Sequence, residues 1–248
     1  MWIKFISMAI SILERFFYYP RLAKIYKILY GDLIQNPVIL DVGANRGQSI
    51  NFFQKHFEGC KIYAFEPLPK LAEKLKKLEN HQIQVIERAV GSSNGETLFW
   101  VSQLEETSSL IMPNAASKWN KTKSLILGKH PSEMFTSISV DCCTLDKFFL
   151  EMIESEIFFL KVDVEGAEYS VLLGAEKLLK EGLIHYLQIE QHENDMRANH
   201  SNEIQGYLTN LGYSRIFHIK HSFGNFYDDI YERSSIQIPS TNTTVVNI

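Results

Sequence analysis

From residue 37 onward, short runs of apolar and often β-branched side chains alternate with segments whose apolar residues recur every three or four positions. Runs of the first kind predict buried strands, and the recurring spacing predicts amphipathic helices. The order begins with a strand at Val38–Val42, a helix at Gln48–Phe57 and a second strand at Lys61–Phe65. This alternation predicts βαβ units and therefore an α/β fold with a doubly wound, mostly parallel sheet.

The alternation continues along the chain, with one irregular interruption. The further helices that it predicts are Leu68–Leu78, Leu145–Met152, Ala167–Lys180 and Ile204–Leu211. The further strands are Ile83–Val90, Thr97–Val101, Ile138–Cys143, Ile157–Val162, Ile184–Ile189, Arg215–Ile219 and Phe226–Tyr231. Residues 104–137 lack such a pattern, and we expect an insertion or lid there, because long irregular segments are usually functional. The domain then spans residues 35–233 and is followed by a loose polar tail over residues 234–248.

The N-terminal residues 1–34 carry a helical pattern of their own. Its first apolar run, Phe5–Leu13, is too short to cross a bilayer, which takes about 20 residues. Glu14 and Arg15 stand where a signal peptide would carry small cleavage-site residues, which disfavours such a leader. Two interpretations of residues 1–29 stay open: a cap that packs on the domain, or amphipathic helices in peripheral contact with a membrane.

Composition narrows the classes of function. The 248 residues carry a net charge of -4 and give a pI of about 6.1, which disfavours a nucleic-acid partner, because such proteins normally show a basic excess. The three cysteines form no C-x-x-C pair, which argues against a zinc site and fits reduced thiols. We therefore expect a cytoplasmic protein, peripheral to the inner face of the membrane if residues 1–29 bind there. Nothing in the composition indicates the oligomeric state.

The sharpest local motif is D-V-G-A-N-R-G at residues 41–47, which follows a predicted strand and opens a predicted helix. In an open parallel sheet, ligands bind beyond the carboxyl ends of the strands. Glycines such as Gly43 and Gly47 let the backbone turn sharply there and approach a ligand closely. Glu66 ends the next strand, where a carboxylate can accept hydrogen bonds from both ribose hydroxyls of a nucleoside.

The motif departs from the G-x-G-x-x-G fingerprint of a nicotinamide site, since Asn45 and Gln48 replace its second and third glycines. The Asp41 carboxylate would also repel a pyrophosphate, whereas it suits the ammonium group of a methionine moiety. The loop and Glu66 therefore favour S-adenosylmethionine over a dinucleotide. A tight turn that binds no ligand is the remaining alternative.

A second group of polar residues is expected at the same edge of the sheet. Asp163 and Glu165 directly follow a buried strand, and Glu190 and His192 follow the core of another. Histidine titrates near neutral pH, so His192 is a candidate general base, with a solvated loop histidine as the alternative. His221 flanks the last predicted hairpin. Together with Lys220 it could contact a substrate, but we favour a solvated face.

Several short sequence motifs occur here in the same order as in one known protein family. Two are specific: D-V-G-A-N-R-G at 41–47 and D-V-E-G-A-E at 163–168. The shorter ones are F-E-P at 65–67, A-V-G at 89–91, S-S-L at 108–110, T-L-D at 144–146 and E-Q-H at 190–192. Over roughly residues 37–195 the chain resembles the FkbM-type methyltransferases, whereas its first 30 residues and its tail lie outside the resemblance.

The resemblance implies a Rossmann-like sheet with an antiparallel last strand, and O-methylation of a sugar hydroxyl in a glycan, a lipopolysaccharide or a natural product. It implies that the residues in contact with S-adenosylmethionine are Asp41, Gly43, Asn45 and Gly47, with Glu66 on the ribose and Arg88 and Ala89 beside the adenine. It implies that the residues facing the small-molecule or glycan acceptor are Asp163, Glu165, Glu190 and His192.

A sugar hydroxyl is a weak nucleophile, so we expect a base, His192 or Asp163, to remove its proton during attack. A divalent cation held by Asp163, Glu165 and Glu190 is an alternative, because it would lower the pKa of the hydroxyl. N-methylation or carboxyl methylation on the same scaffold, and a scaffold that binds the donor without catalysis, also stay open. A nucleic-acid methyltransferase is disfavoured by the acidic pI and by the absence of an N/D-P-P-Y/F word.

Overall fold

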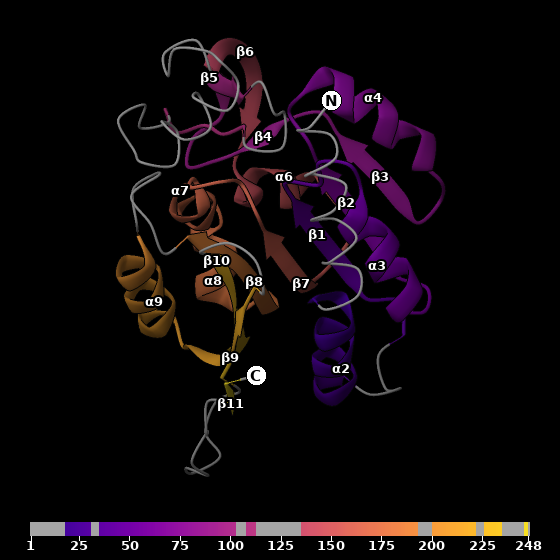
Figure 1. Ribbon diagram of the computed structural model, residues 1–248, viewed down its shortest axis with the longest axis vertical. Coiled ribbons are helices and arrows are strands. Elements are labelled where there is room, and N and C mark those ends of the chain that lie inside the picture. Colours follow the sequence, from indigo (N-terminus) through magenta and orange to yellow (C-terminus); the bar gives the residue numbers. More distant parts are fainter. Residues whose placement is uncertain are drawn as a thin grey trace.

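A sheet of eight strands forms the centre of the molecule (Figure 1). The computed structural model describes residues 18–30, 35–102, 108–112, 135–192, 200–221, 226–234 and 246–247. The strands in their order across the sheet are β11 (Val246–Asn247), β9 (Tyr213–Lys220), β10 (Phe226–Arg233), β8 (Ile184–His192), β7 (Ile157–Val162), β1 (Val38–Val42), β2 (Lys61–Phe65) and β3 (Ile83–Ile86). All pairs from β8 to β3 are parallel, and β10, the last long strand, runs antiparallel to both of its neighbours. The predicted doubly wound sheet is therefore confirmed.

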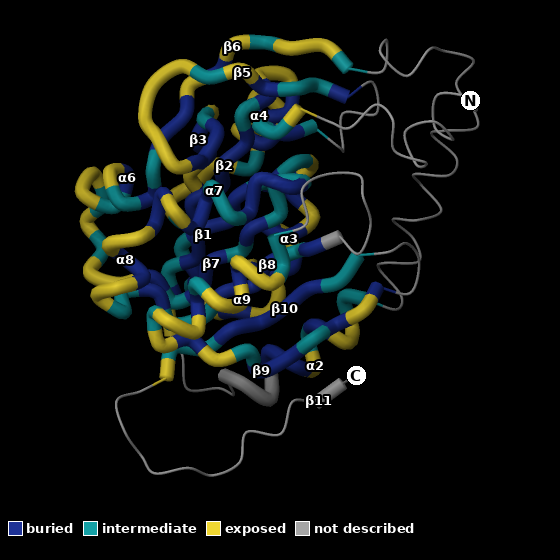
Figure 2. Tube along the Cα trace, turned by 90° about the vertical axis from the view of Figure 1, so that its left-hand side faces the viewer, coloured by how far each residue is buried: buried dark blue, intermediate teal, exposed yellow. Residues whose placement is uncertain are grey.

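Helices cover both faces of this sheet, with a hydrophobic core under each layer. The core of one face, called the α3 face below, includes side chains of α2 (Tyr19–Tyr30), α3 (Gln48–His56) and α4 (Pro69–Leu75), and a 3-10 turn at Lys76–Leu78 continues α4. The core of the other face includes side chains of α6 (Leu145–Glu151), α7 (Glu168–Leu173), α8 (Glu176–Glu181) and α9 (Ser201–Asn210). Figure 2 shows the central strands as buried and much of the outer surface of α6 and α8 as exposed.

A second, three-stranded sheet lies at one end of the molecule, away from β9 and β11 (Figures 1 and 2). Its strands in spatial order are β4 (Ala89–Val90), β6 (Phe135–Cys143) and β5 (Gly95–Ser102). The single strand predicted over 83–90 is thus two strands, because the Arg88 N–H turns back to the carbonyl of Ile86. β6 begins three residues earlier than predicted, and its residues from Phe135 to Cys142 pair with the whole of β5. Most of the predicted insertion, namely its residues 104–107 and 113–134, lies outside the described residues.

The helix predicted over 167–180 is also interrupted, at Gly174. A Cβ atom added to Gly174 would lie 2.0 Å from the carbonyl oxygen of Gly91, so the backbone of the second sheet occupies the space beside it. The chain therefore bends, and α8 starts afresh beside the carboxylate of Asp146, which accepts hydrogen bonds from the N–H groups of Lys177 and Leu178. A contact between segments far apart in sequence thus overrides the local helical pattern.

The N-terminal helix α2 packs on the domain, as the cap interpretation predicts for this part of the extension. Its side chains Leu22, Ile25 and Tyr26 are buried in the core of the α3 face. Within the described chain, no helix combines the length and the apolar character that a membrane span requires. Residues 1–17 lie outside the described residues, so peripheral contact of residues 1–29 with a membrane stays a prediction.

Candidate active site

The loop after β1 is fastened to both neighbouring strands at the carboxyl edge of the sheet. The N–H groups of Gly43 and Ala44 donate to the carbonyl of Phe65 at the end of β2, and the Asp163 N–H after β7 donates to the carbonyl of Val42. From β1 the chain continues to β2, which lies on one side of the β1–β7 pair. From β7 it continues to β8, which lies on the other side. The edge between β1 and β7 is therefore the point where strand order reverses, which is where open α/β sheets bind ligands.

Gly43 is required by a contact that the sequence does not reveal. It has φ 89, and a Cβ atom at this position would lie 1.9 Å from the carbonyl oxygen of Asp163. The sequence predicted a glycine for close approach to a ligand. In the structure, the Gly43 backbone also approaches the loop that follows β7, so this glycine allows the two halves of the edge to pack together.

Replacing Gly43 with alanine is expected to lower the free energy of unfolding by about 2–4 kcal/mol, because the methyl group meets a backbone atom that cannot rotate away. Gly95→Ala is the matched control, since Gly95 also has a positive φ (117) but has no atom within 4 Å of the added Cβ. Comparing the free energies of unfolding of both variants in urea separates the effect of the close contact from the effect of backbone strain. Equal losses in the two variants would show that the contact with Asp163 is unimportant.

Glu66 lies where the sequence predicts the ribose-binding carboxylate. Its side chain is 5% exposed, and its Oε1 and Oε2 accept the backbone N–H groups of Leu68 at 2.9 Å and Asn45 at 3.0 Å. Burial raises the pKa of the Glu66 carboxyl to about 7, although these two N–H groups oppose the rise. Because an ionised carboxylate has about four acceptor positions, each oxygen retains capacity for one further donor.

Two side-chain oxygens of the predicted donor loop are buried and have no hydrogen-bond partner among the described residues, namely Oδ1 of Asp41 and Oδ1 of Asn45. The other oxygen of Asp41 accepts a hydrogen bond from Ser49. Buried acceptors of this kind are costly unless a ligand or water donates to them. Together with Glu66, they fit a ligand that carries an amino group and vicinal hydroxyls, as S-adenosylmethionine does.

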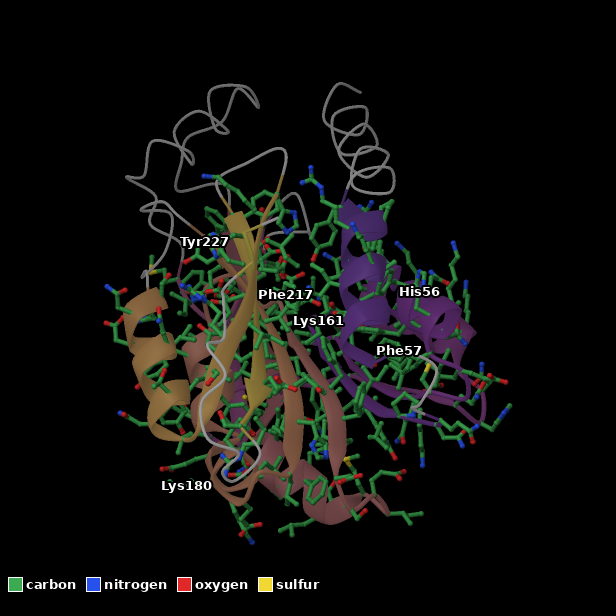
Figure 3. The ribbon with its side chains drawn as sticks, turned by 90° about the horizontal axis from the view of Figure 1, so that it is seen from below. His56, Phe57, Lys161, Lys180, Phe217 and Tyr227 are labelled. Carbon is green, nitrogen blue, oxygen red and sulfur yellow. The ribbon has the colours of Figure 1, made fainter. Side chains whose placement is uncertain are left out.

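Lys161 lies at the centre of the site, on the α3 face of β7 and directly opposite Asp41 in the register of β1 and β7 (Figure 3). Its Nζ is 3.5 Å from Asp41 Oδ1 and 3.2 Å from Asp163 Oδ2. Burial opposes the positive charge, but these carboxylates outweigh burial and raise the pKa of Lys161. Burial, followed by the charges of Asp163 and Asp228, raises the pKa of Glu190 well above its usual range. Sequence reasoning missed Lys161 because it lies within a strand.

The other predicted acceptor residues are only partly described. Glu165 has φ 57 in the loop after β7, and His192 ends β8 opposite Phe226, with its side chain outside the described part of the structure. A further segment, the S-S-L motif at residues 108–110, also lies at this edge, because Ser109 donates a hydrogen bond to the Val164 carbonyl at 3.0 Å.

The residues predicted to border the adenine lie at the start of the second sheet. Ala89 is buried in β4, and Arg88 forms an ion pair with Glu151 of α6, at 3.9 Å between Nη1 and Oε2. The backbone at Arg88 follows β3, one strand beyond Glu66. The structure therefore places this segment near Glu66, with the guanidinium directed toward α6.

A buried cluster that the sequence did not predict lies on the α3 face next to Glu190. His221, interpreted above as solvated, is 8% exposed and bonds through Nε2 to Asp228 Oδ2 at 2.6 Å. Tyr18 OH donates to the same oxygen at 2.7 Å, and Gln188 Nε2 donates to Oδ1 at 2.8 Å. The only sequence signal for this cluster was an apolar hairpin interrupted by charged residues. That pattern does not show which residues the charged side chains contact.

The structure does not assemble the predicted cation ligands Asp163, Glu165 and Glu190. In the described part of the chain, the carboxylates and imidazole that approach one another within 4.8 Å belong to Glu190, His221 and Asp228. The oxygens of Asp228 already accept hydrogen bonds from three side chains, so we describe this group as a hydrogen-bonded cluster and not as a metal centre.

A family model for the methyltransferase FkbM domain matches residues 41–215, more than half of the chain. The 2-O-methyltransferase NoeI of Sinorhizobium fredii (strain NBRC 101917 / NGR234) is 26% identical over 166 residues, which cover 64% of this chain and 65% of that protein. Methyltransferase sdnD of Sordaria araneosa is 28% identical over 187 residues, 68% of this chain and 72% of that protein. The chain thus matches slightly less than two thirds of the length of NoeI.

A solved structure, a putative rRNA-methylase from Clostridium thermocellum, matches with a TM-score of 0.50 at 8% identity, covering 87% of this chain and 95% of that one. At this identity the likeness shows the fold alone. Neither this match nor the relatives above support a divalent cation.

Proposed function

Because the chain belongs to the FkbM methyltransferase family, we propose that it transfers the methyl group of S-adenosylmethionine to a hydroxyl group of a sugar-containing acceptor. The main support for donor binding is the Glu66 carboxylate. It is buried at the edge of the sheet, and each of its oxygens can accept one further hydrogen bond. Next to it lie two more acceptors, Asn45 Oδ1, which has no hydrogen-bond partner among the described residues, and Asp41 Oδ1, which faces the Lys161 ammonium at 3.5 Å.

S-adenosylmethionine, when bound, supplies a methyl group made electrophilic by its sulfonium. The residues of this chain bind and orient it: Glu66 accepts the ribose hydroxyls, and Asn45 and Asp41 offer acceptors for the amino group. The ammonium of Lys161 lies 3.5 Å from Asp41 Oδ1 and holds this side chain in place. Methyl transfer depends largely on holding donor and acceptor in line, so a rigid edge is the main requirement.

We assign the acceptor to the β7–β8 half of the edge, where the predicted residues are Asp163, Glu165, Glu190 and His192. NoeI is named a 2-O-methyltransferase, which favours a hydroxyl over an amine or a carboxylate as the methylated group. Asp163 and His192 remain the predicted bases. A glycan, a lipopolysaccharide or a sugar-bearing natural product would each present suitable hydroxyls.

The test is transfer of tritium from [methyl-³H]S-adenosylmethionine to a panel of acceptors, with donor affinity measured by calorimetry. We expect saturable donor binding, and label on hydroxyls of methyl glycosides of neutral hexoses and deoxyhexoses. Label only on the amines or carboxylates of the panel would support the N- or carboxyl-methyltransferase alternative. Donor binding without transfer to any class would support a scaffold that has lost catalysis, and absence of donor binding by folded protein would refute the donor site.

A further inference from the structure

Side chains from both ends of the chain, outside the residues that match the family model, meet beside the predicted acceptor wall. Tyr18 precedes the matched residues, and His221 and Asp228 follow them. β9 and β8 both run antiparallel to β10, so His221, directly after β9, lies at the same edge as the end of β8. Asp228 of β10 stands opposite Glu190 in register. The hairpin therefore extends the edge that carries Asp163 and Glu190.

His221 is held in one orientation by its surroundings. Asp228, which is 2% exposed, accepts the hydrogen bond of Nε2, and the ring of Tyr18 stacks on the imidazole with centroids 4.2 Å apart at 23°. Phe226 contacts the imidazole at a centroid distance of 4.3 Å. Among the described residues, the imidazole of His221 bonds only to Asp228, while the backbone N–H of His221 donates to the Phe226 carbonyl. A carboxylate partner places the proton on Nε2 and leaves Nδ1 as the accepting nitrogen.

Asp228 remains a carboxylate in this position. Burial disfavours its ionised form, but the hydrogen bond and the charge of His221 outweigh burial and hold the pKa of Asp228 below its usual range. Burial and the Asp228 carboxylate raise the pKa of Tyr18, so its hydroxyl stays protonated and keeps donating. A carboxylate that fixes the tautomer of a histidine and stabilises its cationic form is the arrangement by which histidine serves as a general base.

We propose that His221 is the base that removes the proton of the acceptor hydroxyl, with Asp228 and Tyr18 as positioning residues; His221 has this role only if the proposed function holds. The hydroxyl proton passes to Nδ1 of His221 while the oxygen forms its bond to the methyl carbon. The electron pair of the broken carbon–sulfur bond stays on sulfur, which leaves as a neutral thioether. The imidazolium then releases its proton to water. The carboxylate of Asp228, which is hydrogen-bonded to the imidazole, stabilises the transient positive charge.

Asp163 is differently placed for the same task. Its carboxylate is 3.2 Å from the ammonium of Lys161, so its charge already serves a buried ion pair. Asp163 then fits a role as hydrogen-bond acceptor that orients the hydroxyl. The imidazole of His221 is instead hydrogen-bonded to the Asp228 carboxylate.

The same hairpin offers a matched control. His218 bonds to Asp229 at 2.7 Å between Nδ1 and Oδ1, in a pair like that of His221 and Asp228, but consecutive residues of a strand point to opposite faces. Using the best methyl glycoside of the panel, we expect His221→Gln to lower kcat about 100-fold, a typical contribution of a general base, with donor affinity unchanged within twofold. His218→Gln should keep kcat within about threefold. Equal kcat values for the two variants, each shown to be folded, would overturn the role of His221.

A spectroscopic measurement on the full-length protein tests the pair without an acceptor. In protein with ¹⁵N-labelled histidine, long-range ¹H–¹⁵N correlations report which ring nitrogen carries the proton, and the His221→Gln variant identifies the His221 signals. We expect His221 to be protonated on Nε2 in the wild type, a mixture of tautomers in Asp228→Asn, and weaker preference in Tyr18→Phe. A neutral ring protonated on Nδ1 would overturn the proposal. If donor binds and His221 has the expected tautomer but no glycoside is methylated, the acceptor class of the proposed function is wrong, and His221 then fails as the base for a sugar hydroxyl.

Discussion

Replacing Glu66 with alanine is expected to weaken the binding of S-adenosylmethionine about 100-fold or more. Hydrogen bonds to a charged group contribute about 1.5–3 kcal/mol each, and the Glu66 carboxylate has capacity for two from a ribose. The N–H groups of Asn45 and Leu68 would lose their acceptor in the same variant, which loosens the donor loop. Calorimetric titration of wild type and variant, with circular dichroism to verify folding, provides the measurement. A change of less than threefold would show that Glu66 is not the ribose ligand.

The same carboxylate predicts how donor affinity depends on pH. With the pKa of Glu66 raised to about 7, the ionised fraction in the empty protein increases about tenfold between pH 6 and pH 8. The ionised form accepts both hydroxyls, so affinity should rise by a similar factor over this interval and level off above it. Glu66→Gln removes this titration and keeps that of the donor's own amine. Wild-type and Gln profiles that run parallel would contradict the assignment.

Replacing Lys161 with methionine is expected to lower the free energy of unfolding by about 3–5 kcal/mol at pH 8, because it leaves buried carboxylates without their counter-charge. Asp41 is 0% exposed and shares Lys161 with Asp163. Without the ammonium, the carboxyls would bind protons more tightly in the folded state than in the unfolded state. Stability should therefore fall as pH rises, and most of the loss should be recovered near pH 5.

Urea unfolding of Lys161→Met at pH 5 and pH 8 provides this measurement. The double variant Lys161→Met/Asp163→Asn is the control, because it also removes one of the charges that Lys161 compensates, and we expect it to regain part of the stability at pH 8. If the single variant is as stable as the wild type at both pH values, Lys161 does not organise the edge of the sheet.

Local patterns along the chain were sufficient to predict the fold and to place the predicted donor residues at one edge of the sheet. Val38–Val42, the glycine loop and Glu66 lie within one βαβ unit, so the topology of that unit alone brings them together. The α/β sheet followed from the same alternation of elements. The break at Gly174 did not, because it depends on the backbone of Gly91, which is distant in sequence.

The acceptor half depended on information that a sequence pattern does not contain. Asp228 and Asp229 are neighbours of one residue type, yet one meets His221 and the other meets His218 and Arg215. Which aspartate faces which side is decided by the register of β10 on β8, and register is fixed by packing over the whole sheet. The charge on Lys161 was missed for a similar reason, since its partners lie on a neighbouring strand and in the following loop.

The two halves of the site also become available at different times during synthesis. Asp41, Asn45 and Glu66 leave the ribosome early and within a short stretch, so the donor half can form as soon as its strands pair with β7. The bond between Tyr18 and Asp228 joins positions 210 residues apart. Since chains emerge from the N-terminus onward, almost the whole domain must be synthesised before the Tyr18 hydroxyl can bond to the Asp228 carboxylate. A nascent chain stalled between β8 and β10 would therefore be expected to bind the methyl donor before it can act on an acceptor.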